Sequence, residues 1–215
     1  MNPAIHVKIC GITNRDDALA AIDAGADALG FNLFHGSKRH VRLEQIAPWL
    51  STLGGGALRV AVLVNPSIEE IRRVQPLFDV VQLHGQETPA LCAQAAVTGV
   101  VWKAFPLTAA LDAGAVAPFQ ARALVIDSST PGAFGGTGVL IDLDRAALFV
   151  SATPGAEVWL SGGLHPGNVA DAVKKVRPFG VDVASGVELP GDPRRKDAQR
   201  LRTFIAAARQ DIDGL

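Results

Sequence analysis

Cysteine is scarce in this sequence, with only 2 among 215 residues. Two cysteines cannot form the framework of disulfides that holds many small secreted domains, so we expect a reducing compartment. No spacing of cysteine and histidine is typical of a zinc site, and no metal is expected. The first residues also lack the basic and apolar regions of a secretion signal, which favours a cytoplasmic protein.

An excess of charge of either sign is missing too, since 20 lysines and arginines stand against 21 aspartates and glutamates. This balance gives no electrostatic reason to expect nucleic acid or an anionic membrane surface as a partner. No apolar run approaches the roughly 20 residues that a membrane-spanning helix requires. Apolar residues nevertheless make up 48% of the chain and charged residues 19%, which predicts an ordered globular protein with a sizeable core.

What the sequence does contain is a regular alternation of short apolar runs and amphipathic stretches. The predicted strands are residues 6–12, 28–33, 59–64, 80–84, 100–105, 123–128, 158–161 and 180–184. The predicted helices are residues 16–24, 43–53, 67–77, 88–96, 166–176 and 196–210. Helix-start signals stand at Asn14 or Asp16, at Ser67 with Glu70, and at Thr88 before Pro89. Such alternation is typical of βαβ units that build a parallel sheet.

Eight units in 215 residues leave roughly 27 residues for each, near the lower size limit of a (β/α)8 barrel. An open doubly wound sheet is the alternative, but its G-x-G-x-x-G fingerprint does not follow the first predicted strand. The glycines of residues 54–56 end a predicted helix, and no linker divides the chain. We therefore predict an α/β fold: a single-domain (β/α)8 TIM barrel over residues 1–215, with eight parallel strands and outer helices.

Polar side chains stand at the ends of several predicted strands, where barrel enzymes carry their catalytic groups. Cys10 ends the first strand and Asp127 ends the sixth. Burial would raise the pKa of the Asp127 carboxyl and let it donate a proton, although a helix cap or an ion pair would also account for it. A free cysteine in such a place is often only a small buried apolar group. Together, the thiol and the carboxyl could form an acid/base pair.

Lys8 shares with Cys10 the face of the first strand that points into the barrel, because side chains alternate along a strand. A buried ammonium group requires a partner of opposite charge. Asp182 and Lys103 stand on other predicted strands and are expected to face inward too. We predict an ion-pair network of these three residues beneath the site, with no necessary part in the chemistry.

Three glycine-rich loops occur late in the chain, at residues 134–138, 160–164 and 184–187. Any one of them could be a mere turn. The last two follow the seventh and eighth strands, where barrels of this class often hold a phosphate with backbone N–H groups. A helix that starts near Pro166 would add the positive end of its dipole. These loops predict a small-molecule ligand that ends in a phosphate.

At these positions the chain resembles the phosphoribosylanthranilate isomerase family of tryptophan biosynthesis. The matching stretches are Lys8-Ile9-Cys10-Gly11-Ile12-Thr13, Gln82-Leu83-His84-Gly85, Lys103-Ala104-Phe105, Asp127 with Gly135-Gly136-Thr137-Gly138, Leu160-Ser161-Gly162-Gly163-Leu164, residues 181–188 and Lys196-Asp197. Each glycine loop is weakly specific, whereas the first two motifs followed by Gly-Gly-Thr-Gly are highly specific in this order.

The resemblance implies an Amadori rearrangement of N-(5-phosphoribosyl)anthranilate to 1-(2-carboxyphenylamino)-1-deoxyribulose 5-phosphate, with no cofactor and no metal. It implies that Asp127 is the general acid and the Cys10 thiolate the general base. By the same analogy Arg39 holds the anthranilate carboxylate. The other implied substrate-binding residues are Gln82, His84, Gly135, Gly136, Gly138, Ser161, Gly162, Gly163, Ser185 and Gly186. We expect a monomer or a homodimer.

The chain departs from the family pattern at Ser37-Lys38-Arg39, where Ser-Pro-Arg is usual. Without the proline we expect a less stiff loop around Arg39. The nearest rival is the histidine-pathway sugar isomerase, whose family pattern has a pair of aspartates at strands one and six. Cys10 argues against this family. A phosphate-binding barrel without chemistry would have lost Cys10 or Asp127, and both are present.

Overall fold

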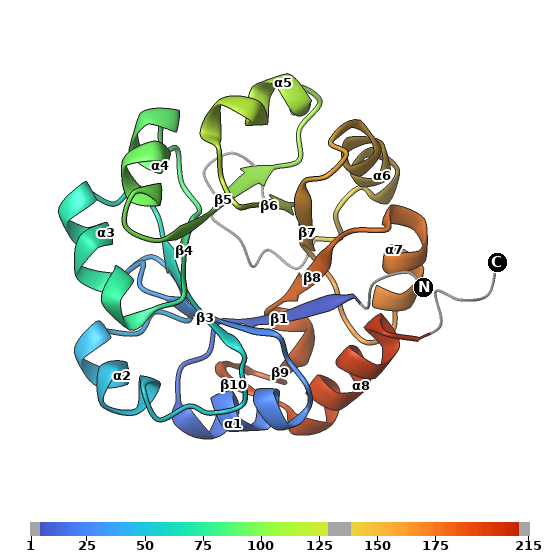
Figure 1. Ribbon diagram of the computed structural model, residues 1–215. Coiled ribbons are helices and arrows are strands. Elements are labelled where there is room, and N and C mark those ends of the chain that lie inside the picture. Colours follow the sequence, from blue (N-terminus) through green and yellow to red (C-terminus); the bar gives the residue numbers. More distant parts are fainter. Residues whose placement is uncertain (1–4, 129–138, 211–215) are drawn as a thin grey trace.

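The eight predicted strands close into one parallel barrel in the computed structural model, which describes residues 5–128 and 139–210 (Figure 1). The strands are β1 (His6–Cys10), β2 (Ala28–Asn32), β3 (Leu58–Leu63), β4 (Val80–Leu83), β5 (Val100–Pro106), β6 (Ala123–Asp127), β7 (Glu157–Ser161) and β8 (Gly180–Val183). β1 pairs with β2 on one side and with β8 on the other, which closes the sheet. The (β/α)8 prediction is therefore confirmed.

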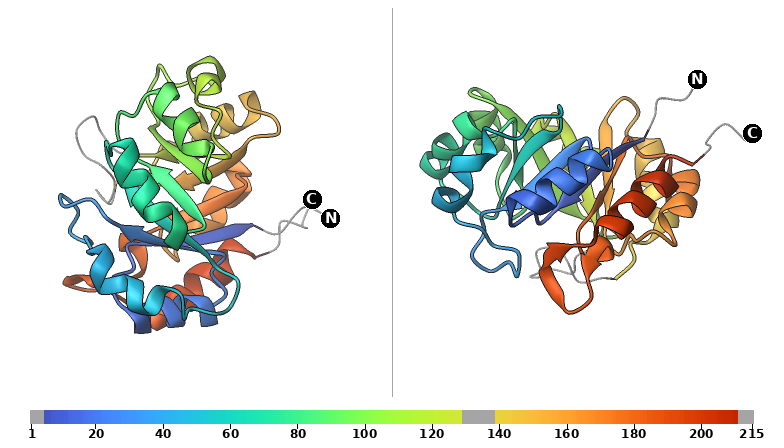
Figure 2. Two further views of the ribbon diagram at one scale, coloured as in Figure 1. Left: turned by 60° about the vertical axis from the view of Figure 1, so that its left-hand side comes forward. Right: turned by 90° about the horizontal axis from the view of Figure 1, so that it is seen from below.

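Helices surround the barrel and cover its outer face, as the two views in Figure 2 show. They are α1 (Arg15–Asp23), α2 (Leu43–Leu50), α3 (Ile68–Val74), α4 (Pro89–Ala96), α5 (Ala113–Val116), α6 (Leu143–Ala152), α7 (Val169–Val176) and α8 (Ala198–Ala208). The predicted capping box is present, because Ser67 Oγ accepts from the Glu70 N–H and the Glu70 carboxylate accepts from the Ser67 N–H. None of the described helices is both long and apolar enough to cross a membrane.

The barrel interior holds an apolar cluster of its own, separate from the larger core between strands and helices. Its members are Ala28, Val60, Val62, Val80, Trp102, Ala104, Ala123, Val125 and Trp159. Gly30 on β2 leaves room for the Cys10 and Lys8 side chains, because a Cβ at position 30 would lie 2.8 Å from Cys10 Sγ and 3.1 Å from Lys8 Cε. A side chain at position 30 would thus displace the groups that point inward from β1.

Two helices were missing from the prediction, and the helix predicted from residue 166 begins later than expected. α5 is a single turn that Asp112 caps, too short for a periodic pattern, and α6 starts after Asp142, whose side chain accepts from the Arg145 N–H. The helix predicted from Pro166 starts only at Val169. The cause is a turn in which Asn168 Oδ1 accepts from the backbone N–H of residue 165.

The loop after β8 contains a short antiparallel hairpin that the sequence pattern did not predict. Its strands are β9 (Glu188–Leu189) and β10 (Asp192–Lys196). The helix predicted over residues 196–210 therefore begins two residues later, at Ala198, after Asp197 accepts from the N–H groups of Gln199 and Arg200. We call this element the β9–β10 hairpin below.

Candidate active site

Cys10 and Asp127 lie on one rim of the barrel, because parallel strands bring all their C-terminal ends to the same side. The Cys10 side chain is partly buried, and its Sγ lies 4.0 Å from Asn32 Oδ1. Asp127 is buried, with 3% of its surface exposed. In the closed strand order β7 and β8 separate β6 from β1, so their loops lie between the carboxyl and the thiol.

A buried ion pair lies beneath Cys10, as the sequence analysis predicted for Lys8 and Asp182. Lys8 Nζ is 2.9 Å from Asp182 Oδ2, and the lysine is wholly inaccessible to solvent. Burial raises the pKa of the Cys10 thiol above its ordinary value, and the nearby ammonium of Lys8 offsets only part of this shift. Cys10 is thus a weak acid here, but a strong base once it is ionised.

Lys103 does not belong to this network, and that part of the prediction was wrong. Its neighbours Trp102 and Ala104 point into the barrel, so alternation along β5 sends Lys103 outward, under α4. Its Nζ lies 3.1 Å from Glu87 Oε2 and donates to the carbonyl of Gly85 at 3.0 Å. This second buried pair stabilises the loop that follows β4.

His84 and Gln82 extend from β4 and the loop after it towards Asp127. His84 Nε2 lies 3.3 Å from Asp127 Oδ2, with a geometry that falls short of an aligned hydrogen bond. Gln82 Nε2 lies 3.3 Å from His84 Nδ1. With Gln82 as the donor, His84 Nδ1 accepts and Nε2 carries the ring proton, so a neutral N–H faces the carboxyl. Tertiary structure therefore joins these two residues to Asp127.

The glycines after β7 and β8 let two loops touch each other between Cys10 and Asp127. A Cβ on Gly186 would collide with the carbonyl oxygen of Leu164, and one on Gly163 would collide with the backbone of Leu140. Gly163 also has a φ of +64°, which disfavours any other residue. Ser161 ends β7, and Ser185 begins the turn 185–187 after β8.

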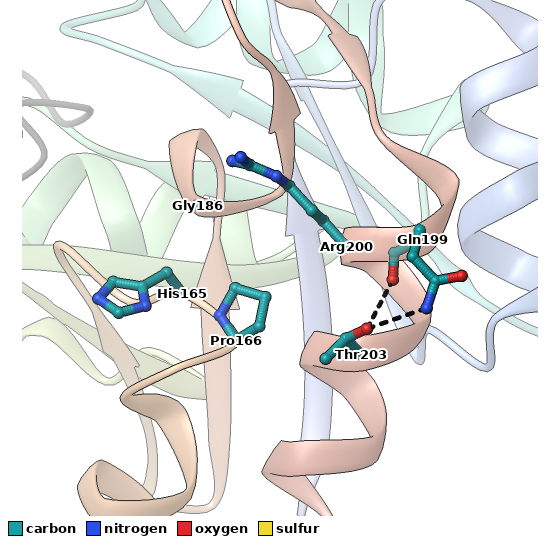
Figure 3. Close-up of a pocket in the computed structure, with 6 residues that line it drawn as sticks. All are labelled: His165, Pro166, Gly186, Gln199, Arg200 and Thr203. Carbon is teal, nitrogen blue, oxygen red and sulfur yellow. Dashed lines mark hydrogen bonds between the residues drawn. The ribbon is translucent and has the colours of Figure 1, made fainter.

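A cavity of about 380 Å³ lies beside the turn at Gly186, and Figure 3 shows the side chains that line it. Arg200 extends into it from α8, opposite His165 and Pro166. The predicted loop residues Gly135, Gly136 and Gly138 lie outside the described residues. In the parts of the chain that the structure describes, no three histidine, cysteine or acidic side chains gather so as to hold a metal ion.

Arg39 reaches the same rim from the loop between β2 and α2. It is 7% exposed, and its stem passes directly over Gly11, where a Cβ would overlap the Arg39 side chain. Glu188 of β9 binds the guanidinium through both carboxylate oxygens, and Lys196 of β10 binds Glu188 in turn. Burial opposes the charge of Arg39, but the hydrogen bonds and charge of Glu188 raise its pKa further.

Glu188 and Lys196 had no predicted role. Both lie in stretches that carry the family resemblance, on either side of the turn sequence Leu189-Pro190-Gly191-Asp192-Pro193. A two-residue strand is too short for a periodic pattern to reveal which way its side chains point. Their convergence on Arg39 is therefore a finding of the tertiary structure alone.

Comparison with protein families decides which barrel this is. The family model of N-(5′-phosphoribosyl)anthranilate (PRA) isomerase matches residues 7–207 of the chain. The chain belongs to the phosphoribosylanthranilate isomerase family. The match spans the barrel from β1 to α8, so it includes both Cys10 and Asp127.

Individual phosphoribosylanthranilate isomerases agree with this assignment. The protein from Citrifermentans bemidjiense is 43% identical over 206 residues, which are 95% of this chain and 97% of the relative. A crystal structure of phosphoribosylanthranilate isomerase with reduced 1-(o-carboxyphenylamino)-1-deoxyribulose 5-phosphate superposes with a TM-score of 0.80 at 34% identity, covering 95% and 98% of the two chains. Monomers of the dimeric enzyme from Thermotoga maritima give the same score, identity and coverage.

Replacing Gly186 by alanine is expected to weaken the binding of substrate at the candidate active site. The new Cβ would collide with Leu164 and push the turn 185–187 off its position. The turn is predicted to bind a phosphate through charge-assisted hydrogen bonds from backbone N–H groups, and their loss should raise KM about tenfold or more. Steady-state kinetics measures this effect. Gly54→Ala is the matched control, because nothing lies within 4 Å of a Cβ there, and an equal KM for the two variants would contradict the prediction.

Proposed function

We propose that Cys10 and Asp127 carry out the isomerisation for which this family is named. The reaction converts N-(5′-phosphoribosyl)anthranilate to 1-(2-carboxyphenylamino)-1-deoxyribulose 5-phosphate in tryptophan biosynthesis. The observation that carries the assignment of roles is the position of the two groups. A thiol and a buried carboxyl face one rim, with two tightly packed glycine loops between them.

In the first step the Asp127 carboxyl donates its proton to the ring oxygen of the ribose. The bond between this oxygen and C1′ breaks, and the nitrogen lone pair forms a C1′=N iminium. In the second step the Cys10 thiolate takes the proton from C2′, and the electrons of that bond neutralise the iminium to give an enol-amine. Tautomerisation of the enol-amine gives the ketone at C2′. Each step is a proton transfer, the chemistry that a positioned acid and base accelerate.

The remaining site residues bind the two ends of the substrate in this proposal. Backbone N–H groups of the loops after β7 and β8 hold the phosphate, with Ser161, Gly162, Gly163, Ser185 and Gly186 on the described loops. Arg39 pairs with the anthranilate carboxylate, since a guanidinium matches a carboxylate with two parallel hydrogen bonds. The neutral His84 N–H and Gln82 steady the Asp127 carboxyl while it changes charge.

We also propose a cytoplasmic setting for the reaction. Cys10 and Cys92 are both free thiols, which suits a reducing cytoplasm. An oxidising compartment would favour oxidation of a free thiolate. We extend the proposal to a monomer or a homodimer, and the dimeric relative from Thermotoga maritima supports the second state.

The rate at which iodoacetamide alkylates Cys10 is expected to rise with pH between about 6 and 9. Only the thiolate reacts, and burial raises the pKa of Cys10, so the thiolate fraction grows roughly tenfold per pH unit below that pKa. Lys8, Lys196 and Arg39 lower this pKa in part, and Asp182 raises it. The measurement uses the variant Cys92→Ser, in which Cys10 is the one cysteine left. A rate that stops rising below pH 7 would contradict the raised pKa, and a rate that bound substrate does not slow would remove Cys10 from the site.

A further inference from the structure

The β9–β10 hairpin brings two charged side chains to Arg39 that take no part in the proton transfers. We propose that Glu188 and Lys196 are positioning residues that orient the Arg39 guanidinium towards the carboxylate of the aromatic amine half of the substrate. This inference rests on the proposed function. It adds two residues that influence substrate specificity through Arg39 and do not contact the substrate themselves.

The two edges of the guanidinium support this orientation. Glu188 accepts hydrogen bonds from Arg39 Nε at 2.5 Å and from Nη2 at 3.1 Å, so it occupies the side edge of the group. A guanidinium has five N–H donors, and its end edge, formed by Nη1 and Nη2, can hold a second carboxylate. Among the described residues nothing accepts from Nη1. Glu188 therefore leaves one edge of Arg39 for a ligand and fixes the plane in which that edge lies.

The charges of the cluster favour an anionic ligand. Lys196 Nζ lies 3.2 Å from Glu188 Oε1 and donates to the carbonyl of Ala184 at 3.1 Å, and all three charged side chains are buried. Two cations and one carboxylate leave a net charge of +1 when Lys196 is protonated. Without Lys196, the pair of Arg39 and Glu188 would be neutral and would attract a carboxylate far less.

Hydrogen bonds join the β9–β10 hairpin to the loop that follows β1 and to the loop that carries Arg39. The Arg194 side chain donates to the carbonyl of His40 at 2.9 Å, and the Thr13 hydroxyl donates to the carbonyl of Arg194. Asp17 of α1 is buried and accepts from the Lys196 backbone N–H at 2.8 Å. In the right-hand view of Figure 2 the hairpin lies at the same end of the barrel as the loop between β2 and α2. These contacts fix the position of Glu188 relative to Arg39.

The sequence around Arg39 makes the contact with Glu188 more important for the orientation of the arginine side chain. Ser37-Lys38-Arg39 has lysine before the arginine, so the backbone there is not stiffened by a proline ring. Within the loop, the Ser37 hydroxyl accepts from the Arg39 N–H and from Asn32 Nδ2, each at 3.1 Å. These contacts fix the backbone of Arg39, and Glu188 fixes its side chain.

A substrate that lacks the carboxylate separates positioning from general stability. Ribose 5-phosphate condenses with anthranilate or with aniline, and the two adducts differ only in this group. We expect Glu188→Gln to reduce the ratio of kcat/KM for the anthranilate adduct to kcat/KM for the aniline adduct about tenfold or more, mainly through KM. Lys196→Met should reduce the same ratio, because it removes the net positive charge. Arg39→Gln should bring the ratio close to one.

Glu157→Gln is the matched control, since Glu157 also pairs with an arginine, Arg122, at 2.5 Å, but at the start of β7. Its ratio should equal that of the unmodified protein. An equal loss of both activities in Glu188→Gln, or an unchanged ratio, would overturn the positioning role while the proposed function stands. An unmodified protein that does not distinguish the two adducts would overturn both the inference and the proposed role of Arg39. If it turns over neither adduct, the proposed function fails as well.

Discussion

Replacing Cys10 by serine or Asp127 by asparagine is expected to lower kcat for the isomerisation by roughly 10²–10⁴-fold, the range of general acid–base catalysis. A serine hydroxyl is a far weaker acid than a thiol, so almost no alkoxide base forms near neutral pH. An asparagine amide has the shape of the carboxyl but no acidic proton to give to the ring oxygen. The loss of anthranilate fluorescence from freshly formed substrate measures both effects.

Two matched substitutions test whether such losses are specific to the rim of the barrel. Cys92→Ser changes the other cysteine, which is buried in α4, and Asp79→Asn changes an aspartate that pairs with Arg59 before β4. Both should keep kcat within a few-fold of the unmodified protein. Should Cys10→Ser and Asp127→Asn behave like these controls, the acid/base assignment would be wrong although the family assignment would remain.

Replacing Asp182 by asparagine is expected to lower the free energy of unfolding by about 3–5 kcal/mol. Lys8 is inaccessible to solvent, and Asp182 Oδ2 at 2.9 Å is its charged partner. The amide would leave an uncompensated ammonium in the barrel interior, directly above apolar side chains. Chemical denaturation followed by circular dichroism measures the change.

An exposed ion pair gives the control for this stability effect. Asp144 lies 2.8 Å from Lys175, nearly the same separation, but 82% of the Asp144 side chain is exposed. Asp144→Asn should change stability little, because water already screens an exposed pair. Similar losses for the two variants would show that burial of the Lys8–Asp182 pair is not what makes it important. Replacing both partners by apolar residues, as in Lys8→Met with Asp182→Leu, should restore much of the stability.

Much of the barrel was predictable because its signals are local. Each strand is a short apolar run between turns or helices, and the capping box at Ser67 and Glu70 depends on residues three apart. Cys10 and Asp127 could be placed at strand ends for the same reason. Errors arose where local signals were weak, as in the single turn of α5, or where the alternation of side chains along a strand was not applied, as for Lys103 on β5.

The sequence by itself determined the fold class, the family and the identity of the candidate acid and base, since these follow from patterns within single strands, helices and motifs. Only the tertiary structure decided which side chains meet. His84 reaches Asp127 from β4, Glu188 reaches Arg39 across 149 positions of sequence, and Lys103 pairs with Glu87 instead of joining Lys8 and Asp182. The physical reason is that a charge finds its partner through distance and burial in space, and neither quantity is encoded in the local periodicity of a chain.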